Sequence, residues 1–245
     1  MPNRNRFLSC LSDHSRELLL SRSTPVDLPI RTSLFEAEQV PSYVFFMTSG
    51  MASIVASMDD GGTAEVGVVG VEGLIGGIHL LGPAKVSTSS FMQIAGTALK
   101  VPFAVLRKEF RASEEIRDRI LEFYQEQSLT VTQIAACNRL HEAEERLARW
   151  LLMAQDRTQS DTLNLTQEFI AIMLGSRRTT VTLIAGALQR ASLIEYSRGR
   201  VKILDREKLE TAACDCYKIT KDLFNNLYAQ PLSSAYEFST NNLHR

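Results

Sequence analysis

Basic side chains are concentrated in one short segment of the C-terminal half of the chain. Between Ser176 and Lys202 the sequence has six basic residues against a single acid, Glu195, whereas the 245-residue chain as a whole has a formal net charge of -1. The basic residues are Arg177, Arg178, Arg190, Arg198, Arg200 and Lys202. Guanidinium groups form paired hydrogen bonds with phosphate oxygens and with guanine edges. The cluster therefore indicates a nucleic-acid contact.

The same segment has the spacing of a helix-turn-helix. Two short helical patterns flank Leu174-Gly175-Ser176 within residues 166–193. Two helices that cross steeply need a small residue at the crossing, a glycine in the turn and apolar residues on the inner face of the second helix. Ala171, Gly175, Val181 and Ile184 fill these roles. The combination is more specific than any one of these residues.

The second helix, expected from about Arg177 to Arg190, has two chemically different faces. A rotation of about 100° per residue turns Val181, Ile184, Ala185 and Leu188 inward, and Thr179, Thr182, Leu183, Gly186 and Arg190 outward. A short polar face that begins with arginines fits a major groove; the plainer interpretation is a solvated basic helix start. The candidate DNA contacts are Ser176, Arg177, Arg178, Thr179, Thr180, Thr182 and Leu183, with Arg198 and Arg200 in the segment that follows.

That segment, residues 193–203, contains two strand-like runs around Ser197-Arg198-Gly199-Arg200. Runs of this kind joined by a glycine-containing turn predict a β-hairpin. A hairpin directly after the second helix is the wing of a winged helix-turn-helix, and its arginines would lie where phosphates pass.

The segment from Ala112 to Leu152 contains no Gly and no Pro, which predicts helix. A largely apolar stripe recurs at intervals of three and four residues. It consists of Ile116, Ile120, Phe123, Gln127, Val131, Ile134, Asn138 and His141. Such a stripe favours a partner helix, with Gln127 and Asn138 fixing the register of a dimer. The alternative is packing on the chain's own β-domain. A second helix is expected from Ala143 to Gln155.

The N-terminal half, from Val26 to about Val105, is rich in β-branched and aromatic residues broken by Gly, Pro, Ser and Asp. Many short strands are expected, with Asp59-Asp60-Gly61-Gly62 as a hairpin turn. Such strands form a small β-barrel or roll. The predicted fold class is α+β, with an antiparallel, jelly-roll-like β-roll, a long dimerisation helix and a C-terminal winged helix-turn-helix.

These motifs resemble the CRP/FNR superfamily of bacterial transcription regulators over roughly residues 20–205. The resemblance is carried by Glu145 to Asp156, Gly175 to Val181 and the hairpin that ends at Ile203, and in the β-roll by Tyr43 to Met47 and Gly73 to Gly76. It implies a sensor domain at residues 1–111, a dimerisation helix at 112–140 and a DNA-binding domain at 141–245 with a frayed tail. It also implies a homodimer on a palindromic double-stranded operator, with RNA polymerase as a further partner.

The chain departs from the cyclic-AMP-binding members of this family. Those members use a Glu for the ribose, then an Arg and a hydroxylated residue for the cyclic phosphate; here the matching positions are Gly77, Ser87 and Thr88, after Gly76. A buried phosphate without its Arg loses its strongest hydrogen bonds. Lys85 could neutralise another anion, or it is an exposed loop lysine. We therefore expect a degenerate effector pocket, in a regulator that is effector-independent or responds to an unidentified signal.

The recognition helix also departs from the family. A family Ser-Arg-Glu triplet is replaced by Arg177-Arg178-Thr179, and a later outward Arg by Leu183. Because a Glu that would accept from cytosine is gone, we expect a different operator sequence.

The four cysteines, Cys10, Cys137, Cys214 and Cys216, fit neither a disulfide framework nor a Cys-x-x-Cys metal pair. The iron-sulfur members of the family need several N-terminal cysteines, and only Cys10 lies there. Cys137 is expected to be a small buried helix residue, with a redox sensor as the alternative. Cys216 is expected in the core of a helix from Arg206 to Tyr228, and His141 is expected to be packed. No metal and no cofactor are predicted.

No phosphate-binding glycine loop, catalytic triad or metal-ligand spacing points to an enzyme. The second functional hypothesis is a cyclic-nucleotide-binding signalling module that acts through protein contacts. The N-terminus lacks the pattern of an export signal, and the apolar stretch Val66 to Leu81 contains Glu72 and five glycines, which disfavours a membrane span. A cytoplasmic protein without membrane contact is expected.

Overall fold

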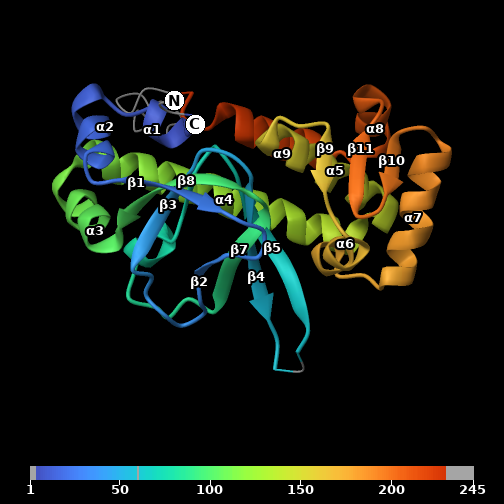
Figure 1. The fold of residues 1–245 in the computed structure, drawn as a ribbon, viewed down its shortest axis with the longest axis horizontal. Helices are drawn as coiled ribbons and strands as arrows, with labels where there is room; N and C mark the ends of the chain where they lie inside the picture. The colour runs from blue at the N-terminus through green and yellow to red at the C-terminus, as the bar shows by residue number, and fades with distance from the viewer. Residues whose placement is uncertain (1–3, 60, 230–245) are drawn as a thin grey trace, which may run out of the picture.

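Short apolar runs in the N-terminal half form two antiparallel four-stranded sheets that pack into a β-roll (Figure 1). The computed structural model describes residues 4–59 and 61–229. The first sheet contains β1 (Thr24–Leu28), β8 (Gly96–Pro102), β3 (Tyr43–Met47) and β6 (Leu74–Ile75), in that order. The second contains β2 (Ser33–Phe35), β7 (Thr88–Ile94), β4 (Met51–Ser57) and β5 (Thr63–Val69). Phe46, Ala52 and Met92 lie wholly buried between the sheets.

The expected hairpin joins β4 to β5, where Ser57 pairs with Thr63. Gly61 has φ of +83°, a conformation that suits glycine; Asp60, part of the predicted turn, lies outside the described residues. The stretch Val66–Leu81 forms the end of β5, β6 and the 3-10 turn η1 (Gly77–Leu80). Among the described residues no helix combines the length and the hydropathy needed to cross a bilayer.

Three helices that precede the long helix in the sequence pack against the roll. They are α1 (Arg6–Ser9), α2 (Asp13–Leu20) and α3 (Phe103–Ala112). The long helix α4 (Glu114–Leu140) has 27 residues, and its first turn is capped by Ser113, whose side chain accepts from the Ile116 amide. Helix α5 (Ala143–Thr158) follows after a short connection at His141 and Glu142.

The first half of α4 packs on the β-roll of its own chain. Ile116, Ile120 and Phe123 are each 0% exposed and belong to the roll's core. Their assignment to a dimer seam is therefore wrong, because a side chain with no exposed area within one chain has no surface to offer a second. Gln127 is buried, whereas Val131 and Asn138 are exposed and Ile134 is half-buried. The alternative of packing on the chain's own β-domain holds for the first half of the helix.

The C-terminal domain contains a three-stranded sheet and four further helices. The sheet has the order β10 (Ile194–Ser197), β11 (Arg200–Ile203), β9 (Thr162–Asn164). The helices are α6 (Gln167–Leu174), α7 (Arg178–Arg190), α8 (Arg206–Ala212) and α9 (Cys216–Asn226). The predicted fold class is confirmed: antiparallel sheets, a long helix and a C-terminal helix-turn-helix region. The tail from Leu232 that was expected to fray lies outside the described residues.

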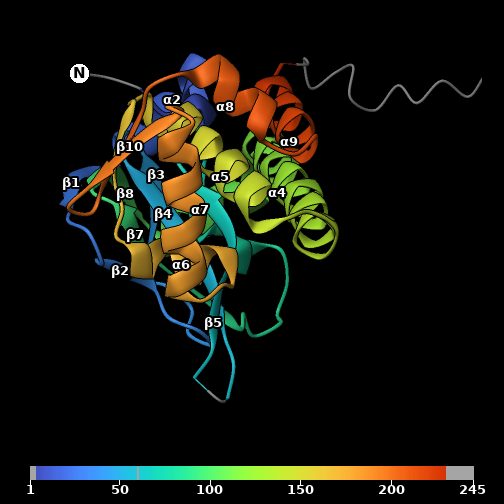
Figure 2. The same ribbon diagram turned by 90° about the vertical axis from the view of Figure 1, so that its right-hand side faces the viewer.

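The expected single helix from Arg206 to Tyr228 is wrong, because the chain breaks between α8 and α9. Ala213 has extended backbone angles and ends α8. The break lets α9 turn back and run beside the second half of α4 (Figures 1 and 2), where it also contacts α5. This packing buries Cys216, Tyr217 and Thr220.

Candidate nucleic-acid interface

The turn between α6 and α7 has the geometry that the glycine spacing predicts. Gly175 lies in the left-handed region, with φ of +56°. Its amide donates to the Ile172 carbonyl at 3.2 Å, and the Ser176 amide donates to the Ala171 carbonyl at 2.9 Å. This pair of bonds is the Schellman motif, which satisfies the last carbonyls of a helix and turns the chain sharply.

Helix α7 presents the expected faces. Val181, Ala185 and Leu188 are buried, and Ile184 is partly buried against the same core. Of the predicted outward residues, Thr179, Thr182, Leu183 and Arg190 are exposed and Gly186 is half-buried. Of the other candidate DNA contacts on this segment, Arg177 and Arg178 are exposed, whereas Ser176 and Thr180 are half-buried. Leu183 is 72% exposed, so this otherwise polar face also offers one apolar side chain.

Arg178 is paired in the free protein with an acid from the neighbouring helix. Its Nη1 lies 2.8 Å from Glu168 Oε1, and both side chains are more than half exposed. An exposed pair of this kind contributes little to stability, so the guanidinium is available for exchange onto a ligand. Thr182 donates to Gln167 Oε1 at 2.9 Å. The side chains of Arg178 and Thr182 are thus oriented by α6.

The hairpin β10–β11 forms the expected wing beside α7 (Figures 1 and 2). Arg198 and Gly199 both have positive φ, +49° and +73°, which is the two-residue turn that matches strand twist. The Gln189 side chain accepts from the Tyr196 amide at 2.9 Å and so ties the wing to α7. Arg198 and Arg200 are exposed. The start of α7 and the wing lie at the same end of the molecule (Figure 1), and the arginines that they carry, Arg178, Arg198 and Arg200, are exposed.

Hydrogen bonds to two carboxylates of the β-roll help to hold α5 against it, beside the apolar contacts of Met51 and Val68. Arg157 Nε donates to Glu72 Oε1 at 2.8 Å, and both side chains are almost completely buried. Trp150 Nε1 donates to Glu65 Oε1 at 2.8 Å. Desolvation raises the pKa of Glu65 to about 7, against the opposing hydrogen bonds from Ser53 and Trp150.

A cavity of about 470 Å³ lies between the β-roll and α4. Gly76 and Thr88 line it, together with aliphatic side chains and Phe123, Tyr124 and Gln127. The other two predicted pocket residues do not line the cavity. Ser87 is exposed, and Gly77 is buried. A Cβ atom on Gly77 would lie 2.9 Å from the Tyr124 hydroxyl. Lys85 is largely exposed, with Glu38 at 3.6 Å. Among the described lining residues none is charged.

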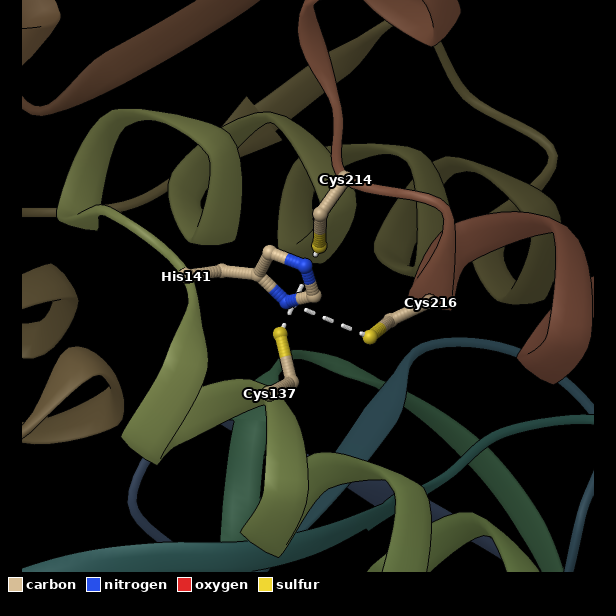
Figure 3. A group of neighbouring side chains, drawn as sticks. All are labelled: Cys137, His141, Cys214 and Cys216. Carbon is tan, nitrogen blue, oxygen red and sulfur yellow. Dashed lines mark hydrogen bonds between the residues drawn. The ribbon is translucent and has the colours of Figure 1, made fainter.

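The structure also gathers four residues that the sequence reasoning treated separately: Cys137, His141, Cys214 and Cys216 (Figure 3). Their ligand atoms all lie within 4.8 Å of one another. A hydrogen bond from Cys214, helped by the charge of Arg149, lowers the pKa of Cys137 below its ordinary value, and the same bond raises the pKa of Cys214. Cys216 is buried, as expected, and His141 is half-buried, but neither residue is isolated, because both lie beside Cys137 and Cys214. The available signal was Cys-x-x-x-His on one helix end plus Cys-x-Cys downstream.

The Crp-like helix-turn-helix domain is the family model that matches the chain, over residues 145–212. Comparison with curated protein sequences found no match. The chain resembles the structure of a crp/fnr-family transcriptional regulator from Eubacterium rectale, with 17% identity over 86% of this chain and 99% of that one, and a TM-score of 0.67.

Two further solved structures share the fold. The c-di-GMP responsive global regulator CLP of Xanthomonas campestris is 18% identical, with 79% of this chain and 100% of that chain covered and a TM-score of 0.64. A CRP-family transcriptional regulator from Thermus thermophilus is 23% identical, with 77% and 96% covered and a TM-score of 0.63. The chain thus carries a Crp-like helix-turn-helix domain within the fold of the CRP/FNR-type transcriptional regulators.

Proposed function

We propose that this protein is a sequence-specific DNA-binding transcription regulator that acts as a homodimer on a palindromic operator. The observation that carries the proposal is the exposed start of α7, where Arg177, Arg178 and Thr179 project from the molecule beside the basic wing. The positive end of the helix dipole adds to this field. The Crp-like domain match supports the same function.

The exposed residues divide into two roles. Arg178, Thr179 and Thr182 enter the major groove and contact base edges, with Leu183 available for a thymine methyl. Arg198 and Arg200 bind phosphates, since a wing arginine reaches the backbone that borders the groove. Arg177 and Ser176, at the helix start, fix the register of α7 on the duplex.

The dimer forms through the face of α4 that its own chain leaves uncovered. Leu121 is 40% exposed, Leu129 50% and Leu140 75%, and at about 100° per residue these three side chains lie within about 100° of one another around the helix. Pairing two copies of this helix would remove these side chains from water and would present two recognition helices to one face of DNA. Val131, Ile134 and Asn138 lie about 140° to 180° around the helix from Leu129, so these three residues are outside this contact region. RNA polymerase is the expected further partner of the DNA-bound dimer.

The cavity favours an uncharged, largely apolar effector over a cyclic nucleotide. Its described lining offers the Thr88, Gln127 and Thr132 side chains for hydrogen bonds and no cation for a phosphate. The same lining argues against the alternative function, a cyclic-nucleotide-binding module that acts through protein contacts.

Selection of operator sequences from a random duplex library by gel shift tests the proposed function. We expect an inverted repeat with half-sites about one helical turn apart. Arg22→Ala removes an exposed arginine far from α7 and serves as the matched control for Arg178→Ala. If no sequence is enriched, and if Arg178→Ala and Arg22→Ala both bind duplex DNA like the parent chain, then α7 is not a recognition helix.

A further inference from the structure

Four potential metal ligands meet at the joint between the long helix and the DNA-binding domain. Cys137 lies in the last turn of α4, and His141 is its C-cap. Cys214 lies in the connection between α8 and α9, and Cys216 is the first residue of α9 (Figure 3). The break in the expected C-terminal helix is what brings the two later cysteines to α4.

The spacing of the four donor atoms fits a single tetrahedral ion. The Cys137 and Cys214 Sγ atoms lie 3.4 Å apart, and Cys216 Sγ lies 3.5 Å from His141 Nδ1. Ordinary Zn–S and Zn–N bond lengths in a tetrahedron give S···S edges of about 3.8 Å and S···N edges of about 3.6 Å. A four-iron cluster, in contrast, would separate its cysteines by the width of the cluster, because each binds a different iron.

The surroundings of the four residues match those of a metal centre. His141 Nε2 lies 3.4 Å from Asp215 Oδ1, a contact that leaves Nδ1 for the ion, as carboxylates do for histidine ligands elsewhere. Gln133 Nε2 donates to Cys216 Sγ at 3.1 Å, which stabilises a thiolate there.

The charge also balances. Three thiolates, a neutral imidazole and a divalent cation sum to one negative charge. Arg149 is 3% exposed, and its positive charge acts on both Cys137 and Cys214. Within residues 4–59 and 61–229 its guanidinium makes a hydrogen bond to the Met153 sulfur and no salt bridge to a carboxylate. A buried cation needs a counter-charge, and the metal-thiolate centre would supply it.

We propose that Cys137, His141, Cys214 and Cys216 bind one zinc ion in a Cys3His site, with His141 coordinating through Nδ1. Three thiolates and one imidazole form a known class of structural zinc site. The ion would fasten α9 to the joint between α4 and α5 and so fix how the DNA-binding domain leaves the long helix. Binding releases the thiol protons to solvent and requires no oxidant.

Cobalt substitution tests the site directly. The reduced, metal-free full-length chain is titrated with Co²⁺, and the visible absorption of tetrahedral thiolate-bound cobalt is recorded; Zn²⁺ then displaces the cobalt. We expect one ion per chain in the parent and in Cys10→Ser, the control at the distant cysteine. We expect loss of the signal in Cys137→Ser and Cys214→Ser, and retention in His141→Cys, which offers four thiolates.

Two further measurements keep the test independent of whether a cysteine variant folds. Asp215→Asn alters an exposed side chain and should weaken cobalt binding by about 10-fold to 100-fold, while Asp222→Asn on the same helix should not. In the parent chain, Zn²⁺ should slow alkylation of Cys137, Cys214 and Cys216 and leave Cys10 unchanged. The proposal would be overturned if the cobalt-loaded chain gave no tetrahedral spectrum, or if the protein contained iron and sulfide. A Cys137–Cys214 disulfide that persists under reducing conditions would also overturn it.

Discussion

The indole Nε1 of Trp150 donates a hydrogen bond of 2.8 Å to Glu65 Oε1, which joins α5 of the DNA-binding domain to strand β5 of the β-roll. Glu65 also accepts from Ser53 at 2.6 Å. The second inter-domain link, between Arg157 and Glu72, is a buried ion pair. Two carboxylates of the roll thus help to fix the orientation of the DNA-binding domain, together with apolar contacts such as that of Phe91 with Phe169.

The raised pKa of Glu65 makes this link sensitive to pH near neutrality. Because the folded-state pKa, about 7, lies above its ordinary value, protonation of Glu65 favours the folded state. The contribution of Glu65 protonation to folding stability is complete at a pH below the ordinary pKa of a glutamate side chain. It is lost as the pH rises through about 7. Trp150 is the only tryptophan of the chain, so its fluorescence should titrate with a midpoint near 7.

Glu65→Gln provides the control for this titration. The amide keeps the shape of the side chain and cannot ionise, so the fluorescence midpoint should disappear. The fall in the urea unfolding midpoint between roughly pH 5 and pH 8 should also become smaller. A midpoint that persists in Glu65→Gln would assign the titration to another group.

Arg178→Ala tests base recognition. We expect a loss of roughly 1 to 3 kcal/mol on the best operator and a relaxed preference at one position of each half-site. Glu168→Ala removes the partner that competes for this guanidinium, and should leave affinity unchanged or raise it. Gel shifts on the selected operator and on single-base variants measure both effects, and unchanged affinity and preference in Arg178→Ala would refute the contact.

Arg200→Ala tests phosphate binding by the wing. Its loss should weaken all duplexes about equally and reduce the slope of log affinity against log salt by about one unit per lost contact. Sequence preference should not change. A base-specific loss in this variant would instead place the wing in a groove.

The pocket predicts which ligands bind. Calorimetry should show no binding of cyclic AMP at micromolar concentrations, because no described lining residue is charged. An uncharged apolar fluorophore should bind, and Gly67→Leu should reduce that binding, since a Cβ there meets no atom closer than 3.8 Å and the side chain can extend into the cavity. Gly82→Leu, at an open surface position, is the matched control. Equal binding by both variants would place the fluorophore outside this cavity.

The sequence was sufficient to predict the elements whose patterns are local. The glycine at position 175 requires a turn, and the period of α7 places Val181 inside and Leu183 outside, as observed. It was insufficient where two distant segments meet. The stripe on α4 predicts burial but does not say against what, and it is the β-roll that covers Ile120. Likewise, no local pattern shows that a break at Ala213 returns Cys214 and Cys216 to Cys137.

Two residues of α4 distinguish burial within one chain from burial between two chains. Leu129 projects from α4 with half of its surface exposed, whereas Ile120 is wholly buried against the roll. Leu129→Asp should therefore convert a dimer into a monomer and leave the thermal midpoint of the monomer nearly unchanged, because its charge stays in water once the helices separate.

Ile120→Asp should behave in the opposite way. Its carboxylate would be buried in the chain's own core with no partner, which costs several kcal/mol whatever the oligomeric state. Val40→Asp, at a 68% exposed position on the roll, is the control that should change neither property. Light scattering gives the mass and thermal unfolding gives the stability. A parent chain that is monomeric, or a Leu129→Asp variant that stays dimeric, would remove α4 as the interface, because the exposed face of this helix is the surface on which the dimer depends.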